Sequence, residues 1–321
     1  MAVYTKVSKA EAEAFLRAYD LGACEDLIGI KQGVENTNYI LHTAKDRYIL
    51  TLYEKRVKPE DLPFFLGLMD HLAQKGVRCP QPVRNEAGAM LGELNGRPAA
   101  ITSFLPGEMT KRILPEECGE LGRALAGMHV AAKGFPLHRP NALSLPGWEK
   151  LLKDCRARAD EVRPGLSKIL ETEFAYLRAH WPTDLPFGVI HADLFPDNVF
   201  FDKGKLCGLI DFYFACEDML AYDLGICFNA WGFERHVSFN ITKARLMVKG
   251  YEEVRPLTDA EKAALPILMR GSDLRFLLTR LYDWLNRVPG ALVKPKDPLE
   301  YMTRLHFHQM AKDISDYGID T

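Results

Sequence analysis

The chain has 321 residues, which is enough for about two domains of ordinary size, each with its own hydrophobic core. Its hydrophobic content of 47% and charged content of 26% are ordinary for a globular protein that folds in water. With 41 basic and 43 acidic residues, it lacks the broad positive field on which non-specific nucleic-acid binding depends. We therefore expect no nucleic-acid partner.

Cysteines and targeting signals indicate a cytoplasmic protein. The seven cysteines are scattered and contain no C-x-x-C pair, so neither a disulfide framework nor a thiolate zinc site is indicated. The first residues lack the apolar segment of a signal peptide, and no apolar run approaches membrane-spanning length. We expect reduced thiols, a cytoplasmic location and no membrane partner.

The first third of the chain reads as a short helix followed by a β-rich region. Ser8 and Glu11 form a capping-box pattern at the start of a helix over residues 8–19. An apolar face at helical spacing predicts a longer helix that starts near Pro59. Asn95-Gly96 is a strong two-residue hairpin signal. Strands are predicted around that helix, over residues 27–31, 39–43, 47–53, 89–94 and 98–104.

From Pro115 onward the pattern is mainly helical, apart from one compact β-hairpin. We place the lobe boundary near Ser103, with residues 1–103 as a nucleotide-binding lobe and residues 104–321 as a helical catalytic and substrate lobe. The predicted fold class is α+β, with a β-rich N-terminal lobe and a mainly helical C-terminal lobe. This is the organisation of protein-kinase-like two-lobe folds.

Residues 189–198 carry the central motif, an apolar strand that runs into a polar loop. His191, Asp193 and Asn198 fit the pattern H-x-D-x-x-x-x-N. In kinases the Asp of this pattern accepts the proton of the attacking hydroxyl, and the Asn holds a metal ion. The motif predicts a catalytic loop with Asp193 at its centre, and we assign His191 a structural role in the catalytic set, beside that carboxylate.

The segment after Asn198 adds geometry to the motif. Residues 199–201 and 206–210 read as the strands of a hairpin, and Asp211 follows the second strand. Antiparallel pairing returns the chain to where it began, so Asn198 and Asp211 should meet at one end of the hairpin. An amide oxygen and a carboxylate there suit Mg²⁺, a hard ion that shares phosphate oxygens.

Each of these residues also has an ordinary structural interpretation. Asp193 could cap backbone amides, Asn198 could be a turn residue and Asp211 could be a helix N-cap. For any one of them alone the structural interpretation is the better one. The ordered set of strand, His-x-Asp, Asn, hairpin and Asp favours catalysis.

Residues 31–38 join two predicted strands and offer candidates for phosphate binding. Backbone N–H groups and short polar side chains can close over phosphates. The alternative is an ordinary polar hairpin loop. No G-x-x-x-x-G-K-[ST] pattern occurs, which argues against a Walker-type site. The candidates in this loop are Gly33, Asn36, Thr37 and Asn38.

Together these residues resemble the aminoglycoside phosphotransferase and choline kinase-like superfamily, and more narrowly the bacterial homoserine kinases built on that fold. The resemblance covers roughly residues 31–283. It rests on the segments Gly-Val-Glu-Asn-Thr-Asn-Tyr at 33–39, Arg-Tyr-Ile-Leu-Thr-Leu-Tyr-Glu at 47–54, the loop at 191–198, and Arg-Phe-Leu-Leu-Thr-Arg-Leu-Tyr-Asp at 275–283.

The resemblance implies transfer of the γ-phosphoryl group of ATP to the side-chain hydroxyl of L-homoserine, on the route to threonine. It implies that Asp193 orients the hydroxyl and that Asn198 and Asp211 hold Mg²⁺. Asp223 stands where relatives have an Asp that braces the catalytic loop. Backbone groups at the hinge are expected to meet adenine, at Ser103, Phe104 and Leu105.

The sequence departs from the kinase pattern at two positions. Thr51 stands in the third strand, where many kinases have a Lys or Arg that pairs with ATP phosphates, and we count it among the nucleotide-binding residues. Lys31 or Arg47 are alternatives for the missing charge. Ala192 replaces the Arg of the protein-kinase H-R-D motif.

The acceptor site is predicted from charge. Homoserine carries a carboxylate and an ammonium, so an Arg fork is expected in the helical lobe. Arg275 and Arg280 are candidates within residues 263–286, and Trp231 is a candidate wall of the pocket. For any one of them, a salt bridge or a core position is the ordinary alternative.

Two other functions compete with this hypothesis. One is phosphorylation of another small alcohol, of the choline, aminoglycoside or methylthioribose type, by the same machinery. The other is a nucleotide-binding scaffold without activity, which the absent strand lysine favours and the intact Asp193, Asn198 and Asp211 oppose.

Overall fold

The computed structural model describes residues 4–30, 36–54, 57–235, 237–287 and 295–319. They form two compact units. Unit 1 comprises Met1–Gly107, Phe135–Leu137 and Cys207–Tyr213, and unit 2 comprises Glu108–Gly134, His138–Leu206 and Phe214–Thr321.

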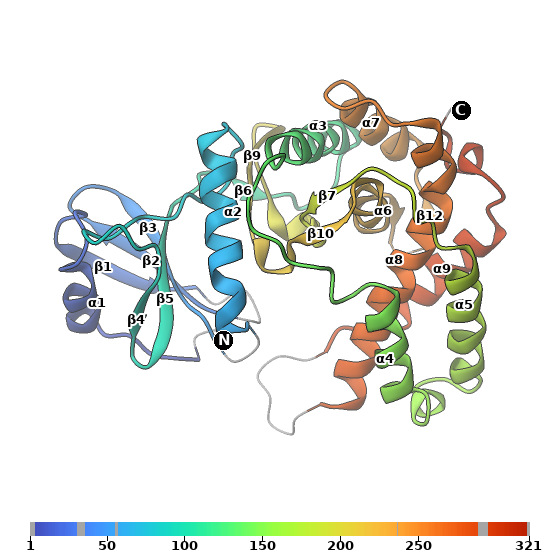
Figure 1. The fold of residues 1–321 in the computed structure, drawn as a ribbon, viewed down its shortest axis with the longest axis horizontal. Helices are drawn as coiled ribbons and strands as arrows, with labels where there is room; N and C mark the ends of the chain where they lie inside the picture. Colours follow the sequence, from blue (N-terminus) through green and yellow to red (C-terminus); the bar gives the residue numbers. More distant parts are fainter. Residues whose placement is uncertain (1–3, 31–35, 55–56, 236, 288–294, 320–321) are drawn as a thin grey trace. The chain divides into compact units, whose positions relative to one another are not determined.

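Unit 1 is built on an antiparallel sheet of five strands, in the order β1-β2-β3-β5-β4 (Figure 1). One short helix precedes the sheet and a longer one is inserted between β3 and β4. The elements are α1 (Lys9–Leu16), β1 (Cys24–Gly29), β2 (Thr37–Thr43), β3 (Arg47–Leu52), η1 (Pro59–Asp61), α2 (Leu62–Gln74), β4 (Gly92–Leu94) and β5 (Arg97–Ser103).

Two local signals of the sequence are confirmed in unit 1. Ser8 and Glu11 form the capping box of α1, in which each side chain satisfies a backbone N–H of the other residue. Asn95 and Gly96 join β4 to β5 in a two-residue turn with φ of 52° and 70°. Both residues lie in the left-handed region, as the tight hairpin turn requires.

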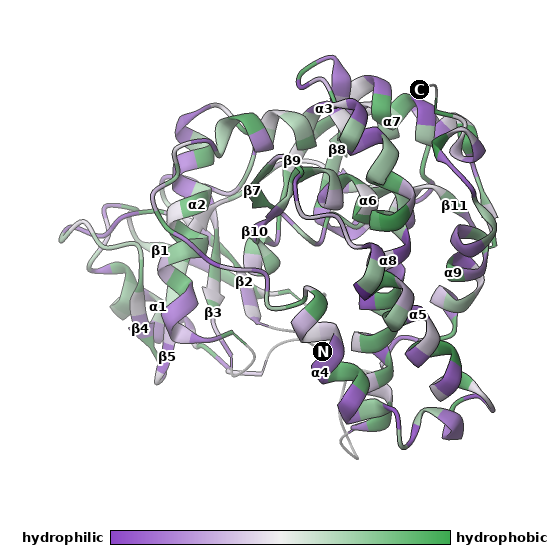
Figure 2. Ribbon diagram, turned by 45° about the vertical axis from the view of Figure 1, so that its right-hand side comes forward, coloured by the Kyte–Doolittle hydropathy of each residue, from purple (hydrophilic) through white to green (hydrophobic). Residues whose placement is uncertain are grey.

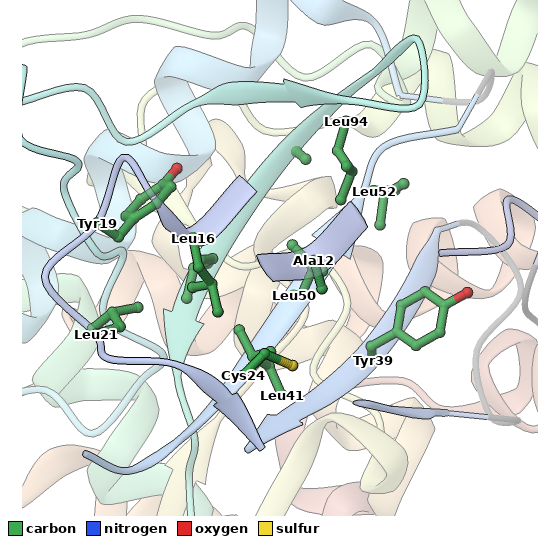
Figure 3. Close-up of a cluster of buried hydrophobic side chains, with 12 residues drawn as sticks. Ala12, Leu16, Tyr19, Leu21, Cys24, Tyr39, Leu41, Leu50, Leu52 and Leu94 are labelled. Atoms are coloured by element: carbon green, nitrogen blue, oxygen red, sulfur yellow. The ribbon is translucent and has the colours of Figure 1, made fainter. Parts of the chain in front are cut away.

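The two faces of the unit 1 sheet differ in character. One face packs against α1, and its core contains Leu16 of the helix together with Leu41 and Leu50 of the sheet (Figure 3). Strand residues alternate between faces, so Asn38 and Thr51, which are direct partners on β2 and β3, lie on the opposite face. That second face combines these polar residues with apolar ones.

Unit 2 is mainly helical, with short strands. Of the elements given below, residues 207–209 of β9 and 212–213 of η4 belong to unit 1. β7 pairs with β10, and β6 pairs with β8 in a three-stranded sheet of order β6-β8-β9. The elements from Glu108 onward are β6 (Glu108–Met109), α3 (Pro115–Ala131), α4 (Leu145–Cys155), η2 (Ala159–Glu161), α5 (Leu166–His180), β7 (Phe187–Ile190), η3 (Pro196–Asn198), β8 (Val199–Asp202), β9 (Lys205–Leu209), η4 (Phe212–Phe214), β10 (Cys216–Met219), α6 (Leu220–Trp231), β11 (Phe233–Glu234), β12 (Ser238–Phe239), α7 (Ile241–Glu252), α8 (Asp259–Leu285), α9 (Glu300–Met310) and η5 (Ile314–Tyr317).

Helix α6 is the centre of unit 2. It packs against α8 and α3, and all of its residues except Ala230 are buried. Figure 2 shows it largely in the colour of hydrophobic residues. A helix that is apolar all round requires neighbours on every side, and the polar residues that it does contain are therefore informative.

Helices α3 and α7 approach each other closely through glycines. A Cβ atom at Gly250 of α7 would lie 2.1 Å from the carbonyl oxygen of Gly119 of α3, and one at Gly122 would lie 2.0 Å from Met247 O. Only glycine allows the two backbones to come this near. The contact fixes the position of α3, and with it His129, along α7.

The fold confirms the predicted class, a mixed α+β protein with a β-rich N-terminal region and a helical C-terminal part. The seven cysteines are all free thiols. Within the residues that the structure describes, none of the helices combines the length and the apolar character needed to cross a membrane.

Candidate active site

The predicted catalytic loop follows β7 directly. β7 ends at Ile190, and the loop leads through the single turn η3 into β8. His191 and Ala192 are buried, whereas Asp193 is half-buried. A loop that is buried at its base and open at one carboxylate can present that carboxylate to a ligand.

Asp223 braces the start of the loop from helix α6. Its Oδ2 accepts the backbone N–H of His191 at 2.7 Å, and its Oδ1 accepts the backbone N–H of Ala192 at 2.9 Å. Oδ2 also lies 3.1 Å from Nε2 of His129. Burial alone would raise the pKa of Asp223, but hydrogen bonds from His129 and His191 and their charge outweigh it and leave this pKa below its ordinary value.

Three side chains hold the carbonyl groups of the same loop. Nη1 of Arg275 donates to Ala192 O at 2.6 Å. Nε1 of Trp231 donates to Leu194 O at 2.8 Å. Nδ2 of Asn198 donates to Asp193 O at 2.7 Å. Each polar backbone group that is held in this way has one orientation, so the loop is rigid before any ligand binds.

Asn198 also contacts the central carboxylate. Its Nδ2 lies 3.2 Å from Asp193 Oδ2, in addition to its bond with the backbone. The amide nitrogen is therefore used within the loop, and Oδ1 has no hydrogen-bond partner among the described residues. This orientation leaves an amide oxygen for a cation, as the sequence motif predicts.

Asp211 belongs to unit 1, where it follows β9 in a left-handed conformation with φ of 64°. Two tyrosines of the same unit, the buried Tyr53 and the half-buried Tyr213, have hydroxyl oxygens 3.3 Å apart. Burial and the Asp211 charge raise the pKa of Tyr213 to about 12, and burial raises that of Tyr53 as well. Both hydroxyls are therefore protonated near neutral pH and serve as neutral hydrogen-bond donors.

The predicted nucleotide residues of unit 1 fall into two groups. Thr51 and Asn38 form one, since Thr51 Oγ1 donates to Asn38 Oδ1 at 2.7 Å. Thr37 and Asn36 form the other, around Glu54: Thr37 Oγ1 donates to its carboxylate at 2.8 Å, and Asn36 Oδ1 accepts its backbone N–H at 3.3 Å. Gly33 and Lys31 lie outside the described residues.

The predicted hinge begins where the ladder of β5 ends. Ser103 is the last residue of that ladder, and its Oγ accepts the backbone N–H of Gln81 at 2.9 Å. The guanidinium of Arg47 lies 4.4 Å from the centre of the Phe104 ring. Arg47 thus has an aromatic partner at the hinge, and Leu105 packs against Gly208 of the same unit.

No charged pair replaces the absent strand lysine in the part of α2 and β3 that the structure describes. Asp70 is the one acidic residue of α2, and it pairs with Arg84 at 2.7 Å. Thr51 is 3% exposed, and its partner is the amide of Asn38. Thr51 and Asn38 thus offer neutral hydrogen-bonding groups, whereas Glu54, after β3, pairs with Arg97 of β5 at 3.3 Å.

Arg280, the remaining candidate for the acceptor site, forms an ion pair within unit 2. Its Nη1 lies 2.6 Å from Glu300 Oε2 of α9, and its guanidinium lies 4.6 Å from the centre of the Tyr301 ring. Arg275 and Trp231 have partners in the catalytic loop. Contact of these three residues with the acceptor stays a prediction.

Sequence reasoning missed His129 and Tyr251. Nδ1 of His129 lies 2.8 Å from the Tyr251 hydroxyl, and Arg255 donates to that hydroxyl at 3.0 Å. The available signal was a histidine at the end of the apolar stripe of α3, because a buried histidine requires partners for both ring nitrogens. A line of hydrogen bonds thus runs from the catalytic loop through Asp223 and His129 to α7.

The fold has solved relatives. An amicoumacin kinase superimposes with a TM-score of 0.68 at 16% identity, covering 95% of this chain and 92% of that chain. A microcompartment-associated aminopropanol kinase superimposes with a TM-score of 0.67 at 18% identity, covering 98% and 99%. At these identities the likeness concerns the fold.

The fold and the braced His-x-Asp loop define a phosphotransferase, and the model of the “Phosphotransferase enzyme family” matches residues 26–257. A homoserine kinase of Chelativorans sp. (strain BNC1) is 58% identical over 320 residues, covering 100% of this chain and 99% of that protein. A homoserine kinase of Rhizobium meliloti (strain 1021) is 57% identical over 319 residues, covering 99% and 98%. The chain belongs to the phosphotransferase enzyme family and, within it, to the homoserine kinases.

Proposed function

We propose that this protein transfers the γ-phosphoryl group of ATP to the side-chain hydroxyl of L-homoserine and releases O-phospho-L-homoserine and ADP. The observation that carries the proposal is identity of 57% to 58% with homoserine kinases over essentially the full length of the chain. A kinase for a biosynthetic intermediate that uses ATP is expected to act in the cytoplasm. The braced loop around Asp193 supplies the chemistry that the reaction needs.

Asp193 is the proposed base. The half-buried carboxylate stands on a loop whose backbone is held by Asp223, Arg275 and Trp231. A carboxylate fixed in this way can accept the hydroxyl proton and align the oxygen with the phosphorus atom without reorganising. His191 contributes by position, since its backbone N–H anchors the base of the loop to Asp223.

We propose that Asn198 Oδ1 and the Asp211 carboxylate would hold Mg²⁺. The fit is supported by the Asn198 amide, whose nitrogen is bonded within the loop and whose oxygen is left for a cation. Across the described residues, no group of three or more His, Cys, Asp or Glu side chains gathers into a metal cluster. Mg²⁺ often takes one or two protein ligands together with phosphate oxygens, whose negative charge it neutralises when bound.

Unit 1 is the proposed nucleotide-binding lobe. The sheet face opposite the α1 core offers apolar strand residues beside the polar pair Asn38 and Thr51, and the hinge after β5 offers backbone groups for adenine. Neutral donors and the cation would then share the role that a lysine has in other kinases.

One assay tests the function. ADP release is measured with Mg-ATP over a panel of acceptors that includes L-homoserine, choline, methylthioribose and an aminoglycoside. Turnover is expected with homoserine at least about 100-fold above the other acceptors, since a site built for a carboxylate and an ammonium rejects molecules that lack one of them. Preference for another alcohol would overturn the acceptor, and ATP binding without turnover on any of them would favour a scaffold.

The matched variant is Asp193→Asn, which keeps the size of the side chain. It is expected to bind ATP as the wild type does and to lose turnover by about 10²- to 10⁴-fold, the usual contribution of a positioned base. Retained turnover at unchanged ATP affinity would remove Asp193 from the mechanism.

A further inference from the structure

Arg275 is a buried cation in the middle of α8. It is 2% exposed, and its guanidinium, which stays charged in proteins, donates from Nη1 to the carbonyl oxygen of Ala192 at 2.6 Å. The neighbouring arginines on the same helix, Arg270 and Arg280, pair with Glu173 and Glu300. Arg275 forms no ion pair with any residue that the structure describes, and its Nε has no hydrogen-bond acceptor there.

The surroundings of Arg275 compensate its charge only in part. Its guanidinium carbon lies 4.5 Å from the centre of the Phe276 ring and 5.9 Å from that of Phe214. The Asp218 carboxylate of the same unit accepts from Asn141 Nδ2 and from its own neighbour's N–H, each at 2.7 Å. Burial of a charge without a hydrogen-bonded carboxylate is unfavourable. The Asp218 charge and the Tyr222 side chain also act on the guanidinium, and the hydrogen bond to Ala192 O is its contact with the catalytic loop.

Ala192 has an unusual backbone. Its φ of 64° lies in the left-handed region, which costs a residue other than glycine roughly 1 kcal/mol or more. Its N–H is held by Asp223 and its C=O by Arg275, at 2.9 Å and 2.6 Å. Two buried side chains of opposite charge therefore fix the two polar groups of one strained residue.

The peptide group that Arg275 holds leads directly into Asp193. Ala192 O belongs to the plane that joins Ala192 to Asp193, and rotation of that plane changes φ of Asp193 and the direction of its side chain. An anchor on this carbonyl therefore sets where the carboxylate points.

We propose that Arg275 is a positioning residue for Asp193: it holds the Ala192–Asp193 peptide plane in the one orientation that aims the carboxylate at the acceptor hydroxyl. The inference rests on the proposed phosphoryl transfer. It differs from the prediction from the sequence, in which Arg275 binds the acceptor carboxylate.

The two roles separate in a kinetic comparison. Arg275→Met removes the charge and the donor but keeps an unbranched apolar chain. ADP release is measured with L-homoserine and with 3-aminopropanol, which is homoserine without its carboxylate. A positioning role predicts that kcat falls about 30- to 100-fold with both acceptors, as expected for loss of a hydrogen bond from a charged group. KM for ATP and for homoserine should change less than about 3-fold on this expectation.

The ratio of kcat/KM for homoserine over 3-aminopropanol should stay the same in Arg275→Met as in the wild type. Collapse of that ratio, with KM for homoserine raised and kcat kept, would overturn the proposal in favour of carboxylate binding. Unchanged kcat would overturn it outright. Arg123→Met, which removes a cation paired with Glu120 and Glu253 on the surface of unit 2, is the control and should keep the wild-type kinetics.

Arg275→Lys keeps a charged donor at this position. It provides a second test if the methionine variant fails to fold. It should recover most of the lost kcat, within about 10-fold of the wild type, at equal thermal stability. The lysine variant could instead fold and bind ATP but have a kcat as low as that of the folded methionine variant. That result would contradict positioning by a hydrogen-bond donor. If the wild type does not turn over homoserine, the proposed function is refuted. The Arg275 variants would then be compared with the wild type on the acceptor that the wild type does phosphorylate.

Discussion

Thr51 on β3 lies directly opposite Asn38 on β2, and its hydroxyl donates to the Asn38 amide oxygen at 2.7 Å. This bond fixes the amide so that its nitrogen, with two N–H donors, faces away from Thr51. The sequence prediction places Thr51 at the strand position where many kinases have a lysine. We propose that this neutral pair contacts the nucleotide in place of a point charge.

Thr51→Val keeps the shape of the side chain and removes the hydroxyl. Because the amide of Asn38 loses its anchor, KM for ATP should rise about 3- to 10-fold, which is the scale of one neutral hydrogen bond. KM for homoserine should stay within 2-fold on the same scale. Steady-state ADP release checks both values, with Thr43→Val at the other end of β2 as the control. A rise confined to the homoserine KM would contradict a role at the nucleotide.

Thr51→Lys is expected to harm the protein rather than restore a kinase lysine. The site is 3% exposed, and the one acid of α2, Asp70, is already paired with Arg84. A buried ammonium without a carboxylate partner should lower the free energy of unfolding by roughly 3 kcal/mol. Thermal unfolding with and without Mg-ATP measures this. Higher stability or tighter ATP binding in the variant would show that a partner for the charge exists.

Asn198→Asp replaces the amide nitrogen by an oxygen beside the Asp193 carbonyl and carboxylate, to which that nitrogen donates at 2.7 Å and 3.2 Å. Two attractive contacts become repulsive, so the loop should shift and kcat should fall at least about 100-fold. ADP release over a series of Mg²⁺ concentrations is the measurement. If the variant keeps full activity at every Mg²⁺ concentration, Asn198 neither orients the base nor holds the metal.

Gly250→Ala should destabilise unit 2. The added Cβ would lie 2.1 Å from the Gly119 carbonyl oxygen, so α3 and α7 must separate, at a cost of roughly 1 to 3 kcal/mol. Gly127→Ala is the matched control on α3, since its Cβ would meet nothing within 4 Å. That control should be more stable by about 0.5 to 1 kcal/mol, because alanine favours a helix. Denaturant unfolding compares the two, and equal stabilities would refute the close packing.

Stability should fall in acid partly through Asp223. Its folded-state pKa lies below the ordinary value of 3.8, because hydrogen bonds from His129 and His191 outweigh the effect of burial. The stability that these bonds supply is therefore complete above pH 3.8 and is lost as the pH falls through the folded-state pKa. Unfolding of the wild type and of Asp223→Asn from pH 6 down to about pH 3 tests this. The difference in free energy of unfolding between the two proteins should become smaller in acid. A difference that does not change with pH would contradict a stabilising role of the ionised Asp223.

Local features of the fold and site were predictable from the sequence. The capping box at Ser8, the Asn95-Gly96 turn and the strand that leads into the loop each depend on neighbours in the chain. The pairing of Thr51 with Asn38 was not predictable in the same way. The sequence shows that a lysine is missing from the third strand, but it does not show that Asn38 lies opposite Thr51.

The anchors of the loop depend on long-range packing. Arg275 lies 83 positions from Ala192, and Trp231 lies 37 positions from Leu194. Arg270, Arg275 and Arg280 are five residues apart on α8, so each is rotated by roughly 140° from the last, and they contact three different partners. Which partner each has follows from helix packing, which periodicity does not specify.

The hydrogen bonds that Asp223 and Arg275 form with Ala192 have a consequence for synthesis of the chain. The ribosome completes residues 191–198 well before Asp223, Trp231 and finally Arg275, so the motif exists for a time without its anchors. A nascent or truncated chain that stops before α8 contains the whole motif at residues 191–198. It lacks Arg275, which holds the carbonyl group of the left-handed residue Ala192. If Arg275 positions Asp193 as proposed, the chain becomes catalytically competent only when α8 docks, and a chain that ends before Arg275 should be inactive even where its N-terminal part has folded.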